Sequence, residues 1–494
     1  MFLVASTPTD HQHRAYYNKM AANHQFTPLD EIMPPVMYAI IFGFPCENKK
    51  KQFQLLQRGL SAVVKDMPFL NGEMTQDDDT NRYRRSVPVL KIPEPVGEMD
   101  LESNDMTVPG ASCPFSYEDF RNAGFPSSRL DDKTFAPLLG TGTRKIMHAR
   151  ANFIEGGCLL TTYFSHSFTD AYGMSLIIAR WAAYCKQAQE IPEGQPLDMV
   201  KIQVLPEDKN ASLLEIQREV SSTEYEKLKH RPELWKLLGL DWRGSRDSAP
   251  PVAPFSSPPV SDTRMFNISA QGLQQLKKDA TPIAEDVAAG GSSWVATNDA
   301  LVAFIWSSIT KARFPFAPPP HIRETSFASV AIDGRKSLSV PMDHLGNVVF
   351  CCMTEVPVSL LRASDTRLGT IASRIRAQVT INKERQRLRD AFSLAACIPD
   401  VRNMANAFPS WFAEDLATTS VVDLPFYNLD FGPAFGKTGN IECFRFPKSQ
   451  FQGLCTIQPR RVDGSVDITI GLELDQMKRL VASEDFTSRV KFVC

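Results

Sequence analysis

The sequence predicts an α/β protein made of two domains, and three observations support this prediction. The chain has 494 residues, more than a single hydrophobic core usually serves. Predicted strands and helices alternate in both halves. A Pro/Ser-rich stretch from Arg243 to Pro259 lies between the halves and has the composition of a crossover linker. We therefore place an N-terminal domain at residues 1–205, a helical insertion with the linker at 206–262, and a C-terminal domain at 263–494.

The N-terminal half is predicted to begin with an extended segment from Leu29 to Phe44, because its prolines oppose a helix that starts before Val36. An amphipathic helix follows and ends at Pro68. Its apolar side is formed by Leu55, Leu56, Leu60, Val63, Val64 and Met67. Beyond Pro68, segments typical of strands continue as far as His166.

His166 lies where strand signals end and helix signals begin. The run from Cys158 to Phe164 is apolar, β-branched and aromatic, which predicts a buried strand. A helix is then indicated by apolar residues at spacings of three, four and seven, namely Met174, Ile177, Ile178, Trp181 and Cys185. An imidazole at such a junction can be held rigidly while its ring faces a cavity, which suits a general base. For a lone histidine, a hydrogen-bonded core or turn residue is the alternative.

In the C-terminal half the prediction is again a mixture of helices and strands. A charged helical piece from Leu213 to Leu238 precedes the linker, and a strand from Thr263 to Ser269 follows it. The clearest helix runs from Thr297 to Arg313, with an apolar stripe formed by Leu301, Phe304, Ile305 and Ile309.

Charge and composition exclude several classes of protein. The 54 basic and 56 acidic residues are well mixed and give a formal net charge of -2, which does not favour a nucleic-acid partner. No apolar stretch reaches the length of about 18 residues that indicates a membrane span, and the N-terminus does not resemble a signal peptide. The ten cysteines are scattered without Cys-x-x-Cys spacing, so we expect reduced thiols, no metal site and a cytoplasmic protein.

Several short segments carry the information about function. Behind the His166-x-x-x-Asp170 motif come four others, in this order: Thr297–Trp306, Ile332–Arg335, Leu345–Asn347 and Thr419–Gly432. Together they resemble the BAHD acyltransferases, especially the fungal trichothecene 3-O-acetyltransferases, over almost the whole chain. The resemblance implies two chloramphenicol-acetyltransferase-like α/β domains with the active-site channel at their interface. It also implies that a segment near residues 433–455 passes back to the first domain.

The resemblance gives the motif residues different roles. His166 would be the general base that takes the proton from an acceptor hydroxyl or amine. A carboxylate four residues away suggests a catalytic dyad in which Asp170 orients the imidazole. In the family, however, the matching Asp pairs with the Arg of the Asp-Gly-Arg segment, so we predict a buried Asp170–Arg335 ion pair. Without this context, Arg335 would be interpreted as a surface turn residue.

Further positions match the family less specifically. Asn298 and Ser420 match positions that line the channel and could stabilise an oxyanion, although Thr297–Asp299 before an apolar run also suits a helix N-cap. Asp430 begins an Asp-Phe-Gly motif and is expected to have a structural role in a turn. The family's tryptophan is absent after Gly432, and Phe435 is the candidate to replace it.

Coenzyme A carries phosphates, so basic residues are expected at the mouth of the channel. Lys277, Lys278 and Lys437 are the candidates, although exposed lysines on a helix are more often simply solvated.

We therefore predict a monomeric, CoA-dependent O-acyltransferase that transfers an acetyl group directly to an alcohol of a fungal terpenoid, alkaloid or polyketide. Acyl-CoA would be its co-substrate, and no cofactor would be bound permanently. Ser165 and Ser167 do not lie in a Gly-x-Ser-x-Gly elbow, which disfavours an acyl-enzyme. One alternative is an amide-forming, condensation-type enzyme or N-acyltransferase, but Ser165 and Ala171 stand where the condensation signature has His and Gly. A non-catalytic ligand-binding relative is the other alternative.

Overall fold

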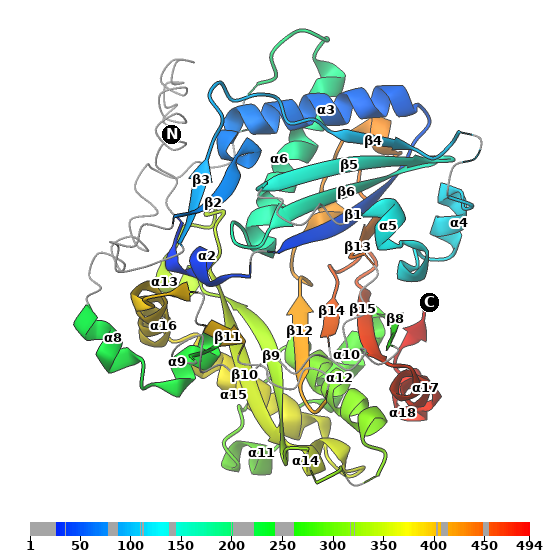
Figure 1. Ribbon diagram of the computed structural model, residues 1–494. Helices are drawn as coiled ribbons and strands as arrows, with labels where there is room; N and C mark the ends of the chain where they lie inside the picture. The colour runs from blue at the N-terminus through cyan, green and yellow to red at the C-terminus, as the bar shows by residue number, and fades with distance from the viewer. Residues whose placement is uncertain are drawn as a thin grey trace, which may run out of the picture.

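The computed structural model describes residues 26–34, 36–77, 87–108, 110, 113–137, 145–198, 200, 222–242, 261–316, 318–320, 322–401, 404–406, 413–447 and 454–494. They form two α/β halves, one above the other in Figure 1, and each half is built on its own large sheet. Residues 206–221 of the predicted insertion and the Pro/Ser-rich stretch lie outside the described residues.

The upper half contains a five-stranded sheet. In spatial order its strands are β13 (Cys443–Arg445), β1 (Met37–Pro45), β6 (Gly157–Ser165), β5 (Met147–Ile154) and β4 (Glu102–Asp105). Side chains alternate across a strand. Phe42 and Phe44 therefore face the core beneath helices α3 (Lys49–Asp66) and α6 (Ala171–Glu190), whereas Ile41 faces the core beside α4 (Tyr117–Asn122) and α5 (Asp132–Phe135). Because both faces of the sheet are covered, β6 is buried along its whole length.

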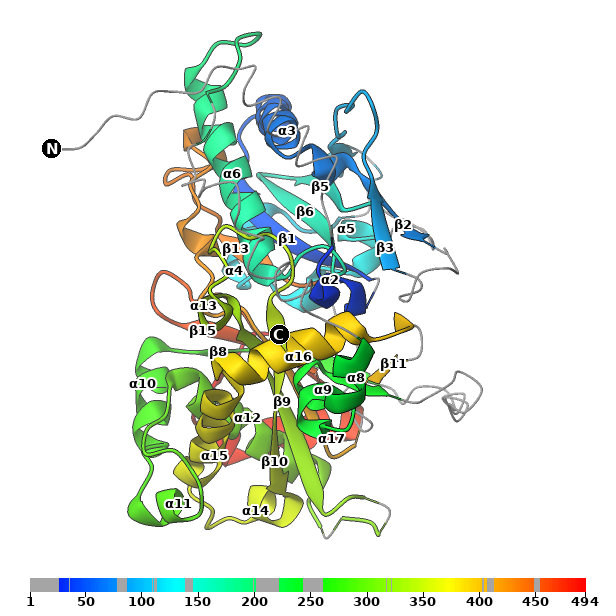
Figure 2. The ribbon, with the colours of Figure 1, turned by 90° about the vertical axis from the view of Figure 1, so that its left-hand side faces the viewer.

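Figure 2 shows α3 and α6 packed side by side on this sheet. The short helix η1 (Pro68–Asn71) follows α3 and leads into the hairpin of β2 (Glu73–Asp77) and β3 (Val87–Lys91).

The lower half contains a seven-stranded mixed sheet. Its strands are, in order, β10 (Val349–Pro357), β9 (Thr325–Asp333), β12 (Leu416–Ser420), β14 (Leu454–Ile457), β15 (Val466–Glu473), β8 (Ser261–Ile268) and β16 (Lys491–Phe492). Strand β12 is parallel to both of its neighbours. The apolar helix α12 (Thr297–Arg313) is central to the packing and contacts α10 (Ala270–Asp279), α14 (Val358–Arg362), α15 (Leu368–Asn382) and α17 (Leu474–Ala482).

The remaining elements lie around these two sheets. Helix α16 (Arg385–Cys397) contacts α2 (Pro28–Ile32), α8 (Ser222–Leu228), α9 (Pro232–Leu237) and α13 (Arg335–Leu338). Short pieces complete the described chain: η2 (Ser127–Arg129), β7 (Leu240–Trp242), α11 (Ala284–Ala288), β11 (Met404–Asn406), η5 (Phe426–Asn428), η6 (Pro433–Phe435) and α18 (Glu484–Thr487).

The most periodic predictions are confirmed, and two others are corrected. The helix before Pro68, the strand–helix junction at His166 and the helix from Thr297 to Arg313 are all present. The predicted single helical piece from Leu213 to Leu238 is wrong within its described part. It contains two helices, α8 and α9, because Pro232 lacks the N–H that helix α8 would need in order to continue.

The expected extended segment from Leu29 to Phe44 is confirmed from Met37 onward by β1, but its start is wrong, because α2 occupies Pro28–Ile32. Pro28 stands in the first turn, where its missing N–H is harmless. Thr27 and Asp30 form a reciprocal capping box that satisfies the free N–H groups of that turn. Leu29 and Ile32 pack into the hydrophobic core of the lower half, although the strand β1 that follows belongs to the upper half.

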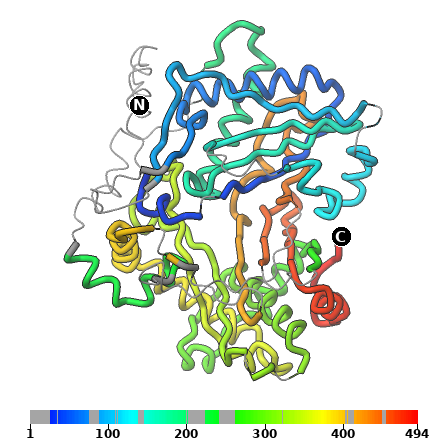
Figure 3. The backbone as a smooth tube through the Cα atoms, viewed as in Figure 1, coloured from blue at the N-terminus to red at the C-terminus, as the bar shows by residue number. Residues whose placement is uncertain are grey.

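A second segment crosses between the halves late in the chain. After β12, residues 421–447 run from the lower into the upper half, where β13 pairs with β1 (Figure 3). Phe426, Phe431 and Phe435 from this segment are buried in the core beneath α3 and α6. The two halves therefore exchange segments in both directions.

No helix in the described ranges is long and apolar enough to cross a membrane. All ten cysteines are free thiols, six of them buried. The described part of the chain holds no cluster of His, Cys, Asp and Glu side chains that could bind a metal ion.

The close pairing of β1 with β13 predicts a position that tolerates only glycine. Gly43 is opposite Cys443, and a Cβ atom at position 43 would lie 2.7 Å from the Cβ atom of Cys443. We expect Gly43→Ala to lower the free energy of unfolding by ~1–3 kcal/mol, because the crossing strand must move. Denaturant unfolding measures this change. Gly97→Ala is the control, since its nearest atom would be 3.9 Å away, and equal stability of the two variants would contradict the close pairing.

Candidate active site

His166 is held at the end of β6, in the turn before α6. Its backbone N–H donates to the carbonyl oxygen of Val36 at 2.9 Å, so the turn is tied to the chain that enters β1. The ring of Tyr38 packs edge-on against the imidazole, with 5.4 Å between the ring centroids. Strand, turn and aromatic neighbour together restrict the position of the ring.

The environment of His166 favours a neutral imidazole. The ring nitrogen Nδ1 is buried and has no hydrogen-bond partner among the described residues. Burial has the largest effect on the pKa of His166 and lowers it below the usual 6.5, although the carbonyl of His166, Asp170 and Asn347 act in the opposite direction. A lowered pKa leaves the imidazole mostly unprotonated near neutral pH, as a general base requires.

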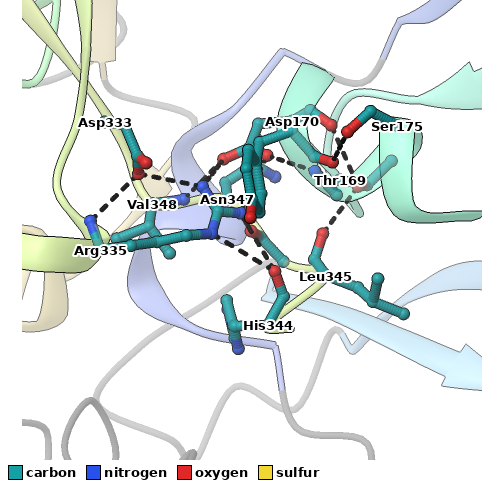
Figure 4. A network of polar contacts seen from close by, with 12 residues as sticks. Thr169, Asp170, Ser175, Asp333, Arg335, His344, Leu345, Asn347 and Val348 are labelled. Carbon is teal, nitrogen blue, oxygen red and sulfur yellow. Dashed lines mark hydrogen bonds and ion pairs between the residues drawn. The ribbon is translucent and has the colours of Figure 1, made fainter. Parts of the chain in front are cut away.

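Asp170 pairs with Arg335 (Figure 4), and no hydrogen bond among the described residues joins it to the imidazole. The two carboxylate oxygens of Asp170 accept from Nη1 and Nη2 of Arg335, both at 2.9 Å, and the side chains are only 7% and 1% exposed. Asp170 also accepts from the N–H groups of Gly173 and Val348, so it caps α6. The orienting-dyad interpretation of Asp170 is therefore not supported, and Arg335 is not a surface residue.

The loop of residues 345–348 is fastened to the same turn. The hydroxyl of Thr169 donates to the carbonyl of Leu345 at 2.6 Å, and Arg335 Nη2 donates to the carbonyl of Gly346 at 2.8 Å. The contact is so close that a Cβ atom at Gly173 would lie 2.1 Å from the oxygen of Leu345. This loop and the His166 turn form a clamp between the two halves.

Asn347 of this clamp and its partner Asp30 were given no role by the sequence. Asp30, in α2, is 2% exposed, and Asn347 is fully buried. The carboxylate of Asp30 accepts from the backbone N–H and the side-chain amide of Asn347, at 2.7 and 2.8 Å. The Leu345–Asn347 motif was the available signal for Asn347, whereas nothing in the local sequence connects Asp30 to it.

Asn298 and Ser420 are brought together in the lower half. The hydroxyl of Ser420, at the end of β12, donates to the amide oxygen of Asn298 at 3.1 Å. Asn298 is the second residue of α12 and does not cap it, because Ala296 holds the N-cap position and its N–H donates to Asp299. Among the described residues, no hydrogen bond joins this pair to His166.

Asn298 also lines a cavity of about 290 Å³ between α10, the start of α12 and the loops that follow β12 and β14. Its lining residues are Leu273, Lys277, Trp294, Ala296, Thr297, Asn298, Leu301, Val422, Asp423, Arg460 and Val466. Lys277 thus lies at a cavity. Lys278 and Lys437 are exposed and do not line it. Arg460 and Trp294 were missed, because loop residues of this kind have no readable spacing.

The Asp-Phe-Gly segment is attached to the far end of α6. Asp430 accepts from Lys186 Nζ at 2.6 Å and from the N–H of Gly432 at 2.8 Å. Burial raises the pKa of Asp430, but these two donors outweigh it and the pKa lies below its ordinary value. The amide of Gln189 donates to Phe431 and accepts from Ala434. These contacts tie the Asp-Phe-Gly segment to the last turns of α6.

Phe435 does not line the cavity. It is fully buried, and its ring lies 5.3 Å from that of Phe44 and 5.4 Å from that of Phe431. The expectation that Phe435 replaces a channel-lining tryptophan is therefore wrong. The segment crosses into the upper half here, and the apolar ring fills the core beneath α3.

Two family models match this chain. The Transferase family matches residues 141–487, and the Trichothecene 3-O-acetyltransferase-like N-terminal domain matches residues 37–185. The chain belongs to the BAHD-type Transferase family. Relatives of similar length support this assignment. Eremophilane O-acetyltransferases of Penicillium roqueforti and Penicillium rubens are each 35% identical over 487 residues, which is 95% of this chain and 98% of the relative.

Solved structures of the family show the same fold. The trichothecene 3-O-acetyltransferase of Fusarium sporotrichioides, complexed with coenzyme A and T-2, has a TM-score of 0.71 at 21% identity and covers 95% of this chain and 99% of its own. Vinorine synthase has a TM-score of 0.55 at 14% identity, with 94% and 93% covered. As a member of this family, the protein is an acyl-CoA-dependent O-acetyltransferase, with acyl-CoA as its co-substrate.

The buried ion pair predicts a large loss of stability when its charge is removed. Asp170→Asn keeps an oxygen that can cap α6, but it leaves the buried Arg335 with the half-exposed Asp333 as its remaining carboxylate partner, at 3.1 Å. We expect the free energy of unfolding to fall by ~3–5 kcal/mol, as measured by denaturant unfolding. Lys186→Gln is the control, because the Lys186–Asp430 pair is 49% and 39% exposed and its loss should cost about 1 kcal/mol or less. Similar losses of unfolding free energy in both variants would contradict a structural role for the buried Asp170–Arg335 pair.

Proposed function

We propose that the enzyme transfers the acetyl group of acetyl-CoA to a hydroxyl of an eremophilane-type sesquiterpenoid, with His166 as the general base. The observation that carries the acceptor is the 35% identity, over 95% of the chain, to two eremophilane O-acetyltransferases. The observation that carries the catalytic role is an imidazole held in a buried turn at the interface of the two halves, where burial lowers its pKa.

The proposed reaction has no covalent enzyme intermediate. His166 takes the proton of the acceptor hydroxyl as the oxygen attacks the thioester carbon. The tetrahedral intermediate then collapses, the carbon–sulfur bond breaks, and the imidazolium returns the proton to the CoA thiolate. Proton transfer of this kind typically contributes about 10²–10⁴-fold to the rate.

The cavity in the lower half is the proposed site of coenzyme A. Lys277 and Arg460 lie on its wall and would neutralise phosphate charge, whereas Trp294 offers an aromatic face. Asn298 and Ser420 are proposed to line the channel and to stabilise the oxyanion. Their mutual hydrogen bond fixes the orientation of the Asn298 amide, which leaves its NH₂ group as a donor.

Other parts of the proposal concern the organisation of the chain. We propose the domain boundaries 1–205, 206–262 and 263–494, with structural roles for Asp170, Arg335 and Asp430. We also propose a monomer, since one chain supplies both sides of the interface, and a cytoplasmic location, which suits ten free thiols. Light scattering during size-exclusion chromatography measures the mass of the particle.

Replacing the proposed base should remove most of the turnover. We expect His166→Ala to lower kcat by about 10²–10⁴-fold with unchanged folding, in an assay of acetyl-CoA with an eremophilane alcohol. His148→Ala is the matched control, because His148 lies in β5 of the same half and contacts Glu102 instead. Unchanged turnover in His166→Ala would contradict the general-base role. Acetylation from a carrier-bound donor only, or of an amine only, would favour the condensation-type alternative.

The CoA site is tested with two neighbouring lysines. Both lysines are exposed on the same helix, but Lys277 lines the cavity and Lys278 does not. We expect Lys277→Ala to raise the KM for acetyl-CoA by about 3- to 10-fold, because a charge-assisted bond to phosphate is lost. Lys278→Ala should leave that KM within about twofold. Equal KM values for both variants in steady-state kinetics would place the phosphates elsewhere.

A further inference from the structure

Asn347 links the lower half to the backbone of His166 itself. Its side-chain NH₂ group donates to Asp30 Oδ1 at 2.8 Å and to the carbonyl oxygen of His166 at 2.9 Å. The side chain is fully buried. A single amide therefore joins α2, the loop of residues 345–348 and the turn that carries the base.

Asp30 determines which way this amide faces. A carboxylate can only accept hydrogen bonds, so the NH₂ group of Asn347 must face it. The other oxygen of Asp30 is occupied by the backbone N–H and the hydroxyl of Thr27, both at 2.9 Å. Burial raises the pKa of Asp30 to about 6, against the effect of these donors, and the group is therefore mainly ionised above neutral pH.

Because the NH₂ group of Asn347 donates to Asp30 and His166, only its amide oxygen could bond to a further group. It is buried and has no hydrogen-bond partner among the described residues. The same holds for Nδ1 of His166, so no hydrogen bond joins the two atoms here, but an amide oxygen and a ring N–H are complementary in chemistry. The carbonyl oxygen of His166, which accepts from Asn347, and the Asn347 side chain both raise the pKa of His166.

We infer that Asn347, oriented by Asp30, is a positioning residue that holds the His166 ring in the tautomer with its proton on Nδ1. This inference rests on the proposed role of His166 as the base. A proton on Nδ1 leaves the lone pair on Nε2, where it can accept the proton of the acceptor hydroxyl. Asp170 is not available for this task, because Arg335, Gly173 and Val348 occupy its oxygens.

The first experiment compares two buried asparagines. Asn347→Ala should lower kcat by about 10- to 100-fold, as for other hydrogen bonds that orient a histidine ring, with the KM for acetyl-CoA within about twofold. Asn152→Ala is the matched control. Asn152 is equally buried in the upper half, and its side chain donates to three oxygens, those of Phe135, Leu159 and Thr161, where that of Asn347 donates to two. Its loss should lower stability without a comparable loss of kcat.

The pH profile separates positioning from a purely structural role. The acidic limb of kcat/KM for the wild type should report a pKa below 6.5. Because Asn347 raises this pKa, Asn347→Ala should move the limb to lower pH. Asp170 and Tyr38 also act on the ring, whereas Asp30 and Arg335 are connected to it through Asn347 and Asp170. Burial keeps the pKa of Tyr38 well above its usual range, so its hydroxyl stays protonated.

A second variant covers the possibility that Asn347→Ala does not fold. Asp30→Asn removes a charge that is unfavourable to bury, so this variant should fold, but its amide no longer forces the NH₂ group of Asn347 to face it. We expect kcat to fall by about 3- to 10-fold.

Three results would overturn the inference. They are an unchanged kcat in Asn347→Ala or in Asp30→Asn, an equal loss of kcat in Asn152→Ala, and a loss of kcat without movement of the acidic limb. Assays of His166→Ala made in parallel keep the two proposals apart. Full activity of His166→Ala would show that His166 is not the general base. If His166→Ala is inactive but the Asn347 and Asp30 variants behave like the wild type, only the positioning role is rejected.

Discussion

The ion pair between Asp170 and Arg335 is the interaction on which the arrangement of the site depends. Burying two charges is costly, and such a pair stabilises a protein only when its geometry is good and its remaining polar atoms are satisfied. Both conditions hold here, because the contact is bidentate and the same carboxylate caps α6 and accepts from Val348. Since Asp170 and Arg335 come from different halves of the chain, the pair fixes the turn of His166 relative to the lower half.

Helix α6 connects the turn that holds this pair to the Asp-Phe-Gly segment at the other end of the upper half. Its first turn meets the clamp, where only a glycine at position 173 allows the backbone of Leu345 to approach. Its last turns hold the Asp-Phe-Gly segment through Lys186 and Gln189. Two motifs that are about 260 residues apart in the sequence are thus attached to opposite ends of one helix. The exchanged segments, α2 and β13, add further connections between the halves.

Burial controls the protonation of the site. It lowers the pKa of His166 and raises that of Asp30, in each case because a charged form loses its hydration. The imidazole is therefore neutral in the pH range where Asp30 is mainly ionised. A neutral base beside a fixed amide needs little reorganisation when it accepts a proton. The structure thus combines an available base with a rigid support for it.

The sequence by itself determined the local elements and the principal motif. Periodicity predicted α3, α12 and the junction at His166, because the spacing of apolar residues reports the side that is buried. Motif order predicted the family and the Asp170–Arg335 pair.

Only the tertiary structure decided the remaining contacts. It showed the hydrogen bonds between Asp30 and Asn347, which are 317 residues apart, and it separated Lys277 at the cavity from Lys278 beside it. It also placed Phe435 in the core and made a helix of α2 despite its prolines. Such contacts depend on how distant segments pack, and a local pattern of residues does not specify its distant partner.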